Sequence, residues 1–206
     1  MPSYSTRVRV GTTVPKNATT SRGVPMQVVY RQTWTAPAVA DADGHIVTQL
    51  MTTAGTTTTF GGVLGGVNDV SRALVYDADG ASTGTVTVVG KDQHGNTRTE
   101  AVTLNGTAAV QGKVAFKSLT SVTWTATSAV NLILGTNDVL GLDYKMEVDS
   151  VFWELEDQVA ATAGTVVAAS AAANADPLGT YDPNSALNTA LDFDIFYVVT
   201  DIDNLT

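Results

Sequence analysis

The clearest pattern in the chain is a period-two alternation of apolar and polar residues between positions 84 and 127. Val86 and Val88 alternate with threonines up to a turn at 91–96, and a second alternating run then leads to Asn105-Gly106. Apolar residues at every second position, bounded by Gly, Asn and Asp, are typical of a half-buried antiparallel hairpin. Residues 113–127 predict a second hairpin, so we expect four strands with short turns that leave no room for crossover helices.

Similar signals predict strands elsewhere, over 26–34, 45–51, 71–76, 129–134 and 191–200. Residues 149–157 also alternate, and the Val-Phe-Trp sequence favours a strand over a helix. The small, apolar residues 159–175 are the best helix candidate, but Gly164 and the β-branched residues after it favour a strand and a loop. The Gly- and Thr-rich residues 52–66 predict a long mobile loop or an exposed strand. The predicted fold is therefore all-β, a jelly-roll-like or Greek-key β-sandwich.

The composition narrows the class of protein. A chain of 206 residues suits one large domain, which we predict over 25–206, preceded by an extended arm at 1–24. The absence of cysteine excludes disulfides, thiolate zinc sites and cysteine nucleophiles, and it fits assembly in a reducing cytoplasm. The start of the sequence has no apolar signal region, and no apolar run is long enough to cross a bilayer.

Charge is distributed unevenly along the chain. The first 31 residues contain no acid and five bases, which are Arg7, Arg9, Lys16, Arg22 and Arg31. From Asp138 to the end there are thirteen acids and a single base, Lys145. An acidic body argues against general nucleic-acid binding. We expect the five bases to bind an acidic partner surface; a soluble tail without a partner is the alternative.

The sequence offers little catalytic or metal-binding chemistry. Two DADG segments, at 41–44 and 77–80, resemble parts of a calcium loop but lack its other ligands, so plain turns are predicted. His45 and His94 are the two histidines, and each lies in or beside a predicted turn. No nucleophile elbow, phosphate loop or zinc motif is present. We therefore expect no enzyme activity, no cofactor and no metal.

Aromatic residues carry two further expectations. The three tryptophans, Trp34, Trp124 and Trp153, lie at apolar positions of predicted strands, so we expect them in the core. Phe152, and Phe196 with Val198, lie on the opposite parity from their apolar neighbours. These three residues predict self-association through a strand face, unless a loop of the same chain covers them.

Four segments resemble a group of virion proteins from tailed bacteriophages. They are GTVTVVGKDQHGNTRTEAVTLNGT from Gly84, KVAFKSLTSVTW from Lys113, LGTNDVLGLDYKM from Leu134 and GTYDPNSALNTALDFDIFYVV from Gly179. The resemblance covers about two thirds of the chain, from Arg72 to Leu205. Its motifs are turn and strand signatures, and the N-terminal third matches none of them.

This resemblance implies a structural role in a virion. Members of the group resemble capsid cement or decoration proteins, which bind the major capsid protein on the outer surface of the expanded head. It therefore implies a non-enzymatic homo-oligomer, with a trimer favoured, that is assembled in the host cytoplasm and contacts neither nucleic acid nor membrane. A fibre or receptor-binding module that recognises host glycans is the alternative, and a carbohydrate-binding bacterial surface domain is a third possibility.

Overall fold

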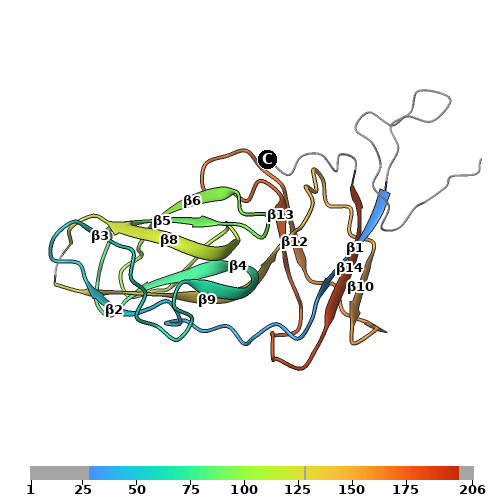
Figure 1. Ribbon diagram of the computed structural model, residues 1–206, viewed down its shortest axis with the longest axis horizontal. Helices are drawn as coiled ribbons and strands as arrows, with labels where there is room; N and C mark the ends of the chain where they lie inside the picture. Colours follow the sequence, from blue (N-terminus) through green and yellow to red (C-terminus); the bar gives the residue numbers. More distant parts are fainter. Residues whose placement is uncertain (1–27, 128, 200–206) are drawn as a thin grey trace, which may run out of the picture.

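The computed structural model describes residues 28–127 and 129–199 of the 206-residue chain (Figure 1). These residues form antiparallel strands joined by turns and loops, with no helix among them. The all-β, β-sandwich-like fold that the sequence predicted is confirmed, whereas jelly-roll or Greek-key connectivity stays a prediction. The predicted arm at 1–24 lies outside the described residues.

The described residues contain strands of two to twelve residues. In chain order they are β1 (Val28–Trp34), β2 (Ile46–Leu50), β3 (Gly55–Thr57), β4 (Val67–Ala78), β5 (Thr85–Lys91), β6 (Thr97–Thr103), β7 (Val110–Gln111), β8 (Phe116–Trp124), β9 (Asn131–Gly141), β10 (Trp153–Glu156), β11 (Val159–Ala160), β12 (Thr165–Ala168), β13 (Gly179–Asp182) and β14 (Phe193–Val199).

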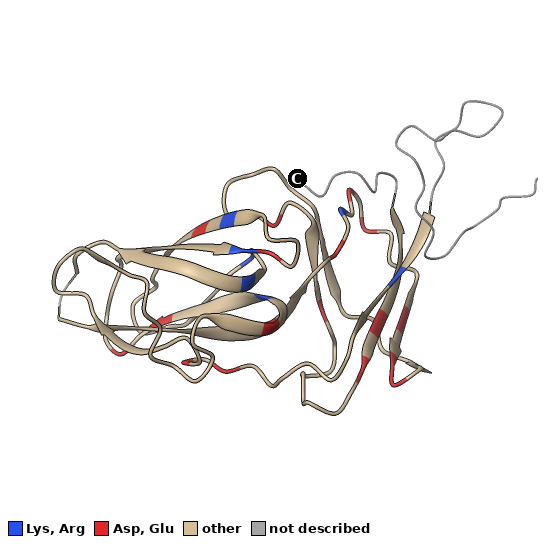
Figure 2. Ribbon diagram, viewed as in Figure 1, with Lys and Arg blue, Asp and Glu red and all other residues tan. Residues whose placement is uncertain are grey.

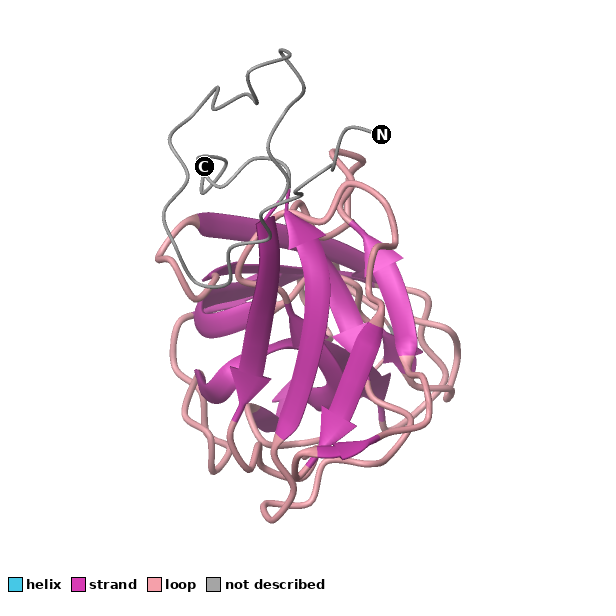
Figure 3. Cartoon of the chain, turned by 90° about the vertical axis from the view of Figure 1, so that its right-hand side faces the viewer, coloured by secondary structure: helices cyan, strands magenta, loops and turns pink. Residues whose placement is uncertain are grey.

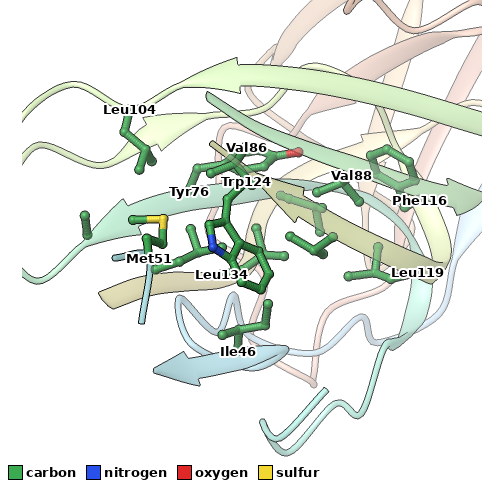
Figure 4. Packing of buried hydrophobic residues seen from close by; sticks show 14 of the residues in the cluster. Ile46, Met51, Tyr76, Val86, Val88, Leu104, Phe116, Leu119, Trp124 and Leu134 are labelled. Atoms are coloured by element: carbon green, nitrogen blue, oxygen red, sulfur yellow. The ribbon is translucent and has the colours of Figure 1, made fainter. Parts of the chain in front are cut away.

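The larger sheet has the strand order β12-β13-β9-β4-β8-β5-β6, with β2, β3 and β7 paired to β9, β8 and β4. It curls around the first of two hydrophobic cores, in the left half of Figure 1. Trp124, Phe116 and Tyr76 are the largest side chains of that core, and Met51 packs with them from the end of β2 (Figure 4). The central hairpin predicted from the alternation is β5 and β6, in register from Thr85↔Thr103 to Lys91↔Thr97.

The smaller sheet has the order β1-β14-β10-β11 and faces the viewer in Figure 3. Its inner face carries Trp34, Phe193, Ile195 and Tyr197, which form the second core with residues from β9, β13 and the loops after them. β1 and β14 are far apart in sequence but pair without a register shift, from Val28↔Val199 to Trp34↔Phe193. The first and last described strands therefore close the fold together.

A buried polar cluster joins the two sheets where β9 ends. The Gln32 amide donates to the carbonyl oxygen of Gly141 at 3.0 Å, and its oxygen accepts from the backbone N–H of Asp143 at 2.8 Å. The Tyr197 hydroxyl donates to the same Gln32 oxygen at 3.2 Å. Tyr30 donates to the Asp143 carboxylate, also at 3.2 Å. Because buried polar groups are costly unless paired, this cluster fixes how the smaller sheet lies on the larger one.

Two predicted strand boundaries are wrong. The second hairpin, expected over 113–127, is the single strand β8, because no Gly, Pro or Asn interrupts its residues and a bulge at Val89/Gly90 of β5 absorbs the change of register. Gly135, expected to end a strand, lies inside β9. It is there because the backbone of Asp41 and Ala42 packs against it, at a distance that only a residue without a Cβ allows.

Candidate interaction surface

The outer face of the smaller sheet carries apolar and aromatic side chains, and its edge strand β1 carries one basic residue (Figure 2). Since residues 193, 195, 197 and 199 of β14 point into the second core, Phe196 and Val198 face outward. Phe196 lies directly between Arg31 of β1 and Trp153 of β10 in the strand register. Phe152 lies beside Trp153. We call these residues, Arg31, Phe152, Trp153, Phe196 and Val198, the aromatic face.

The rings of the aromatic face contact one another. The centroids of Trp153 and Phe196 are 5.3 Å apart, and those of Phe152 and Phe196 are 6.4 Å apart. The Arg31 guanidinium lies 5.8 Å from the Phe196 ring centre, in cation–π geometry. Phe152 is 59% exposed and Trp153 is 52% exposed. Figure 3 shows the smaller sheet in front of the other strands, with its outer face toward the viewer.

One ion pair neutralises the charges of this face. The Arg31 side chain donates two hydrogen bonds to the Asp194 carboxylate, from Nε at 3.0 Å and from Nη2 at 2.8 Å. The Thr33 hydroxyl donates to the same carboxylate. Burial would raise the pKa of Asp194, but the hydrogen bonds from Arg31 and Thr33 hold this pKa below its ordinary value. Asp194 therefore stays charged, and its charge is balanced within the face.

The sequence assigned the two sides of β10 the wrong way round. Trp153 was expected in the core, which would turn Glu154 and Glu156 outward, but Trp153 itself faces outward. Glu154 instead points inward, where it accepts hydrogen bonds from the Tyr181 hydroxyl and the Gly164 N–H, both at 2.7 Å. Glu156 accepts one from the Ser185 hydroxyl at 2.9 Å. Alternation gives the period of a strand but not the buried side, and these inward partners lie 10 to 29 positions further along the chain, outside the alternating segment.

The structure brings together two groups of residues that the sequence singled out separately. Phe152, Phe196 and Val198, predicted for self-association, lie on the same face as Arg31, which was grouped with the basic arm. Arg31 lies in β1 instead, and its guanidinium is engaged by Asp194. Arg7, Arg9, Lys16 and Arg22 lie outside the described residues. Of the other tryptophans, Trp34 and Trp124 are buried as predicted.

The DADG segments and histidines have structural partners. The Asp41 carboxylate accepts from the N–H of Asp43 in its own turn, and Asp79 holds the backbone and side-chain amide groups of Asn131. His94 contacts the carbonyl oxygen of Asp143 at 2.7 Å. Within the described residues, no group of three or more His, Cys, Asp and Glu side chains has the geometry to hold a metal ion.

His45 is fully buried and uncharged, which leads to a testable pH dependence. Burial lowers its pKa to about 4, although Nε2 lies 2.9 Å from the Asn68 amide oxygen. Since the unfolded chain takes up the proton near pH 6.5, the folded state loses stability as the pH falls from about 6.5 to about 4.

We expect the free energy of unfolding of the wild type to fall by about 2 kcal/mol, relative to that of His45→Gln, between about pH 6.5 and pH 4.5. Urea unfolding at the two pH values measures this difference. Parallel pH profiles for the two proteins would contradict a buried, neutral His45.

The described residues also form a pocket at the opposite end of the molecule, with a volume of about 330 Å³. It is lined by Ala, Gly, Ser and Thr side chains from residues 81–84, 106 and 125–127. None of these residues titrates near neutral pH, so the pocket holds no candidate acid, base or charged ligand group. The described residues contain no helix that is long and apolar enough to span a membrane.

Comparison with known proteins assigns no family to this chain. No protein-family model, curated protein or solved structure matches it. The aromatic face is therefore interpreted from its own geometry.

Proposed function

We propose that this protein is a non-enzymatic structural protein of a tailed-bacteriophage virion, namely a cement protein on the outer capsid. The observation that carries the proposal is the aromatic face, which offers exposed rings on a rigid sheet with its one ion pair already balanced. Exposed aromatic groups on a rigid element are typical of protein-binding surfaces. In this proposal the chain self-associates through the aromatic face, and the basic arm binds the major capsid protein.

The chemistry of the face favours a protein partner over a sugar. Glycan sites combine an aromatic platform with polar groups that are free to bind hydroxyls. Here the Asp194 carboxylate is occupied by Arg31 and Thr33, and Glu154 of the neighbouring strand points inward, away from this face. A partner that buries apolar area would bind without breaking these hydrogen bonds.

A glycan-binding fibre module remains the second candidate, because one observation favours it. Phe152 and Trp153 are both more than half exposed, and a sugar ring can stack on exposed aromatic rings. Binding of soluble oligosaccharides, measured on a glycan array with the wild type and with Trp153→Ala, separates the two candidates. Loss of a specific glycan signal in Trp153→Ala would favour the fibre module.

The self-association step predicts a specific effect of charge on the aromatic face. We expect Phe196→Asp to lower the mass of the oligomer. It removes a Phe ring whose burial between subunits contributes about 1.5–3 kcal/mol per subunit, and it places a second carboxylate beside Asp194. Sedimentation at low micromolar concentration and raised salt measures the mass. The control is Val63→Asp, which introduces the same carboxylate at an apolar residue that is 88% exposed.

The virion role is tested on phage heads that lack this protein. Purified wild-type protein should bind the expanded heads and raise the temperature at which they release DNA, whereas Phe196→Asp should bind them weakly. Cryo-electron microscopy of the decorated heads gives the position and symmetry of the bound copies. Heads that bind neither protein, with normal binding to tails or fibres, would contradict the capsid role.

A further inference from the structure

The smaller sheet ends at β1, whose outer edge pairs with no described residue. Val198 and Ser150 exchange hydrogen bonds, and the carbonyl oxygens of Phe196 and Asp192 accept from residues 152 and 157. Even-numbered residues of β14 therefore direct their backbone groups toward β10, and odd-numbered residues direct theirs toward β1. Their partners in β1 are residues 28, 30, 32 and 34. The N–H and C=O groups of Val29, Arg31 and Thr33 consequently point away from β14.

Within the described residues, this edge lacks the features by which proteins usually prevent strand pairing. Natural edge strands are short, or carry proline, lysine or a bulge. β1 runs for seven residues with an uninterrupted register and contains neither Pro nor Lys. Its one charged residue, Arg31, lies over the Phe196 ring and is bound to Asp194 instead of extending past the edge.

We infer that β1 pairs with β1 of a second copy of this chain, antiparallel and about a two-fold axis at Arg31. Val29 of each copy then faces Thr33 of the other, which is a favourable β-branched pair. The two Arg31 residues face each other, but each is already neutralised by its own Asp194 at 2.8 Å. The two sheets would form one continuous sheet, with their aromatic faces side by side on its outer surface.

This contact is distinct from the self-association proposed above, which buries the aromatic face instead of the strand edge. An antiparallel pair about a two-fold axis is closed and forms a dimer. A subunit with both contacts would join neighbours in two directions, which would serve the cement role proposed above. The edge contact does not depend on that role, because it follows from the backbone of β1.

Because the natural chain contains no cysteine, the pairing can be tested by disulfide cross-linking of the full-length protein. Residues opposite each other in such a ladder have Cα atoms about 5.5 Å apart, within the range a disulfide needs. The double variant Val29→Cys/Thr33→Cys should form a covalent dimer in a glutathione redox buffer. The single variants are the controls. In a single variant, the cysteine of one subunit would lie about 13 Å from the same cysteine of the other subunit, so neither single variant should cross-link.

A second measurement does not rely on cysteine. Val29→Pro removes an N–H that points away from β14, so the fold should remain while the edge pairing is lost. Phe196→Asp removes the contact through the aromatic face, so this variant should sediment as a dimer held by the β1 edge alone. The double variant Phe196→Asp/Val29→Pro should sediment as a monomer. The control is Phe196→Asp/Val29→Thr, which keeps the N–H and should remain a dimer. Cross-linking of the singles as efficient as that of the double variant, or a monomeric Phe196→Asp protein, would overturn the edge pairing. These results test the edge pairing alone; the proposed capsid role is tested separately, by the binding of Phe196→Asp to phage heads.

Discussion

Replacing Glu100 by alanine is expected to destabilise the fold by about 3–5 kcal/mol, although Glu100 lies in no candidate site. Glu100 is 1% exposed, and its carboxylate accepts three hydrogen bonds. The donors are the backbone N–H groups of Lys113 and Val114, at 2.5 and 3.2 Å, and the Tyr76 hydroxyl at 2.8 Å. Alanine would leave all three donors without this acceptor. The Tyr76 hydroxyl and the Val114 N–H are buried, and each buried donor left unpaired costs about 1–3 kcal/mol.

The matched variant Glu100→Gln should cost about 1 kcal/mol or less. Its amide oxygen can accept from both backbone N–H groups, and its amide nitrogen can donate to the Tyr76 oxygen. Burial raises the pKa of Glu100, so the charged form is itself costly and glutamine removes that cost. Urea unfolding of both variants at pH 7 measures the difference. Equal destabilisation by alanine and glutamine would show that the charge, not the acceptor oxygens, stabilises this part of the core.

Gly135→Ala is the second substitution with a large expected effect. A Cβ at Gly135 would lie 1.9 Å from the carbonyl oxygen of Asp41 and 2.3 Å from the carbonyl carbon of Ala42. Both atoms belong to the backbone, and that turn is fixed to β9 by the hydrogen bond from Thr136 N–H to the Asp41 oxygen at 2.7 Å. Relief of the clash requires the turn to leave β9. We expect a loss of about 3 kcal/mol or more, or failure to fold.

The control for Gly135→Ala is Gly61→Ala, because no heavy atom lies within 4 Å of a Cβ at Gly61. The free energy of unfolding of that variant should lie within about 0.5 kcal/mol of the wild-type value. Thermal unfolding, followed by circular dichroism, compares the two substitutions directly. A Gly135→Ala protein that melts like Gly61→Ala would show that the 41–44 turn does not pack closely on β9.

The sequence by itself determined the fold class and most of the strands. Alternating residues such as Val86, Val88 and Val102 predict strands because only one face of each is buried, and this preference is local. The pairing of β5 with β6 followed for the same reason, since a short turn joins them. The outward position of Phe196 and Val198 also followed from parity alone, because apolar residues at successive positions of this strand break the usual alternation. Self-association through them stays a prediction.

Tertiary structure decided what local patterns do not contain. Trp153 is exposed and Glu154 is buried because Tyr181 and Gly164 satisfy the glutamate from another part of the chain. Gly135 lies inside a strand because the turn at Asp41 packs on it from about 94 positions earlier, a contact that local propensity does not encode. The aromatic face exists because β1 and β14 pair across almost the whole chain, which places Arg31 beside Phe196. Such long-range pairings depend on the global packing of both cores, so they are fixed only when the whole chain folds.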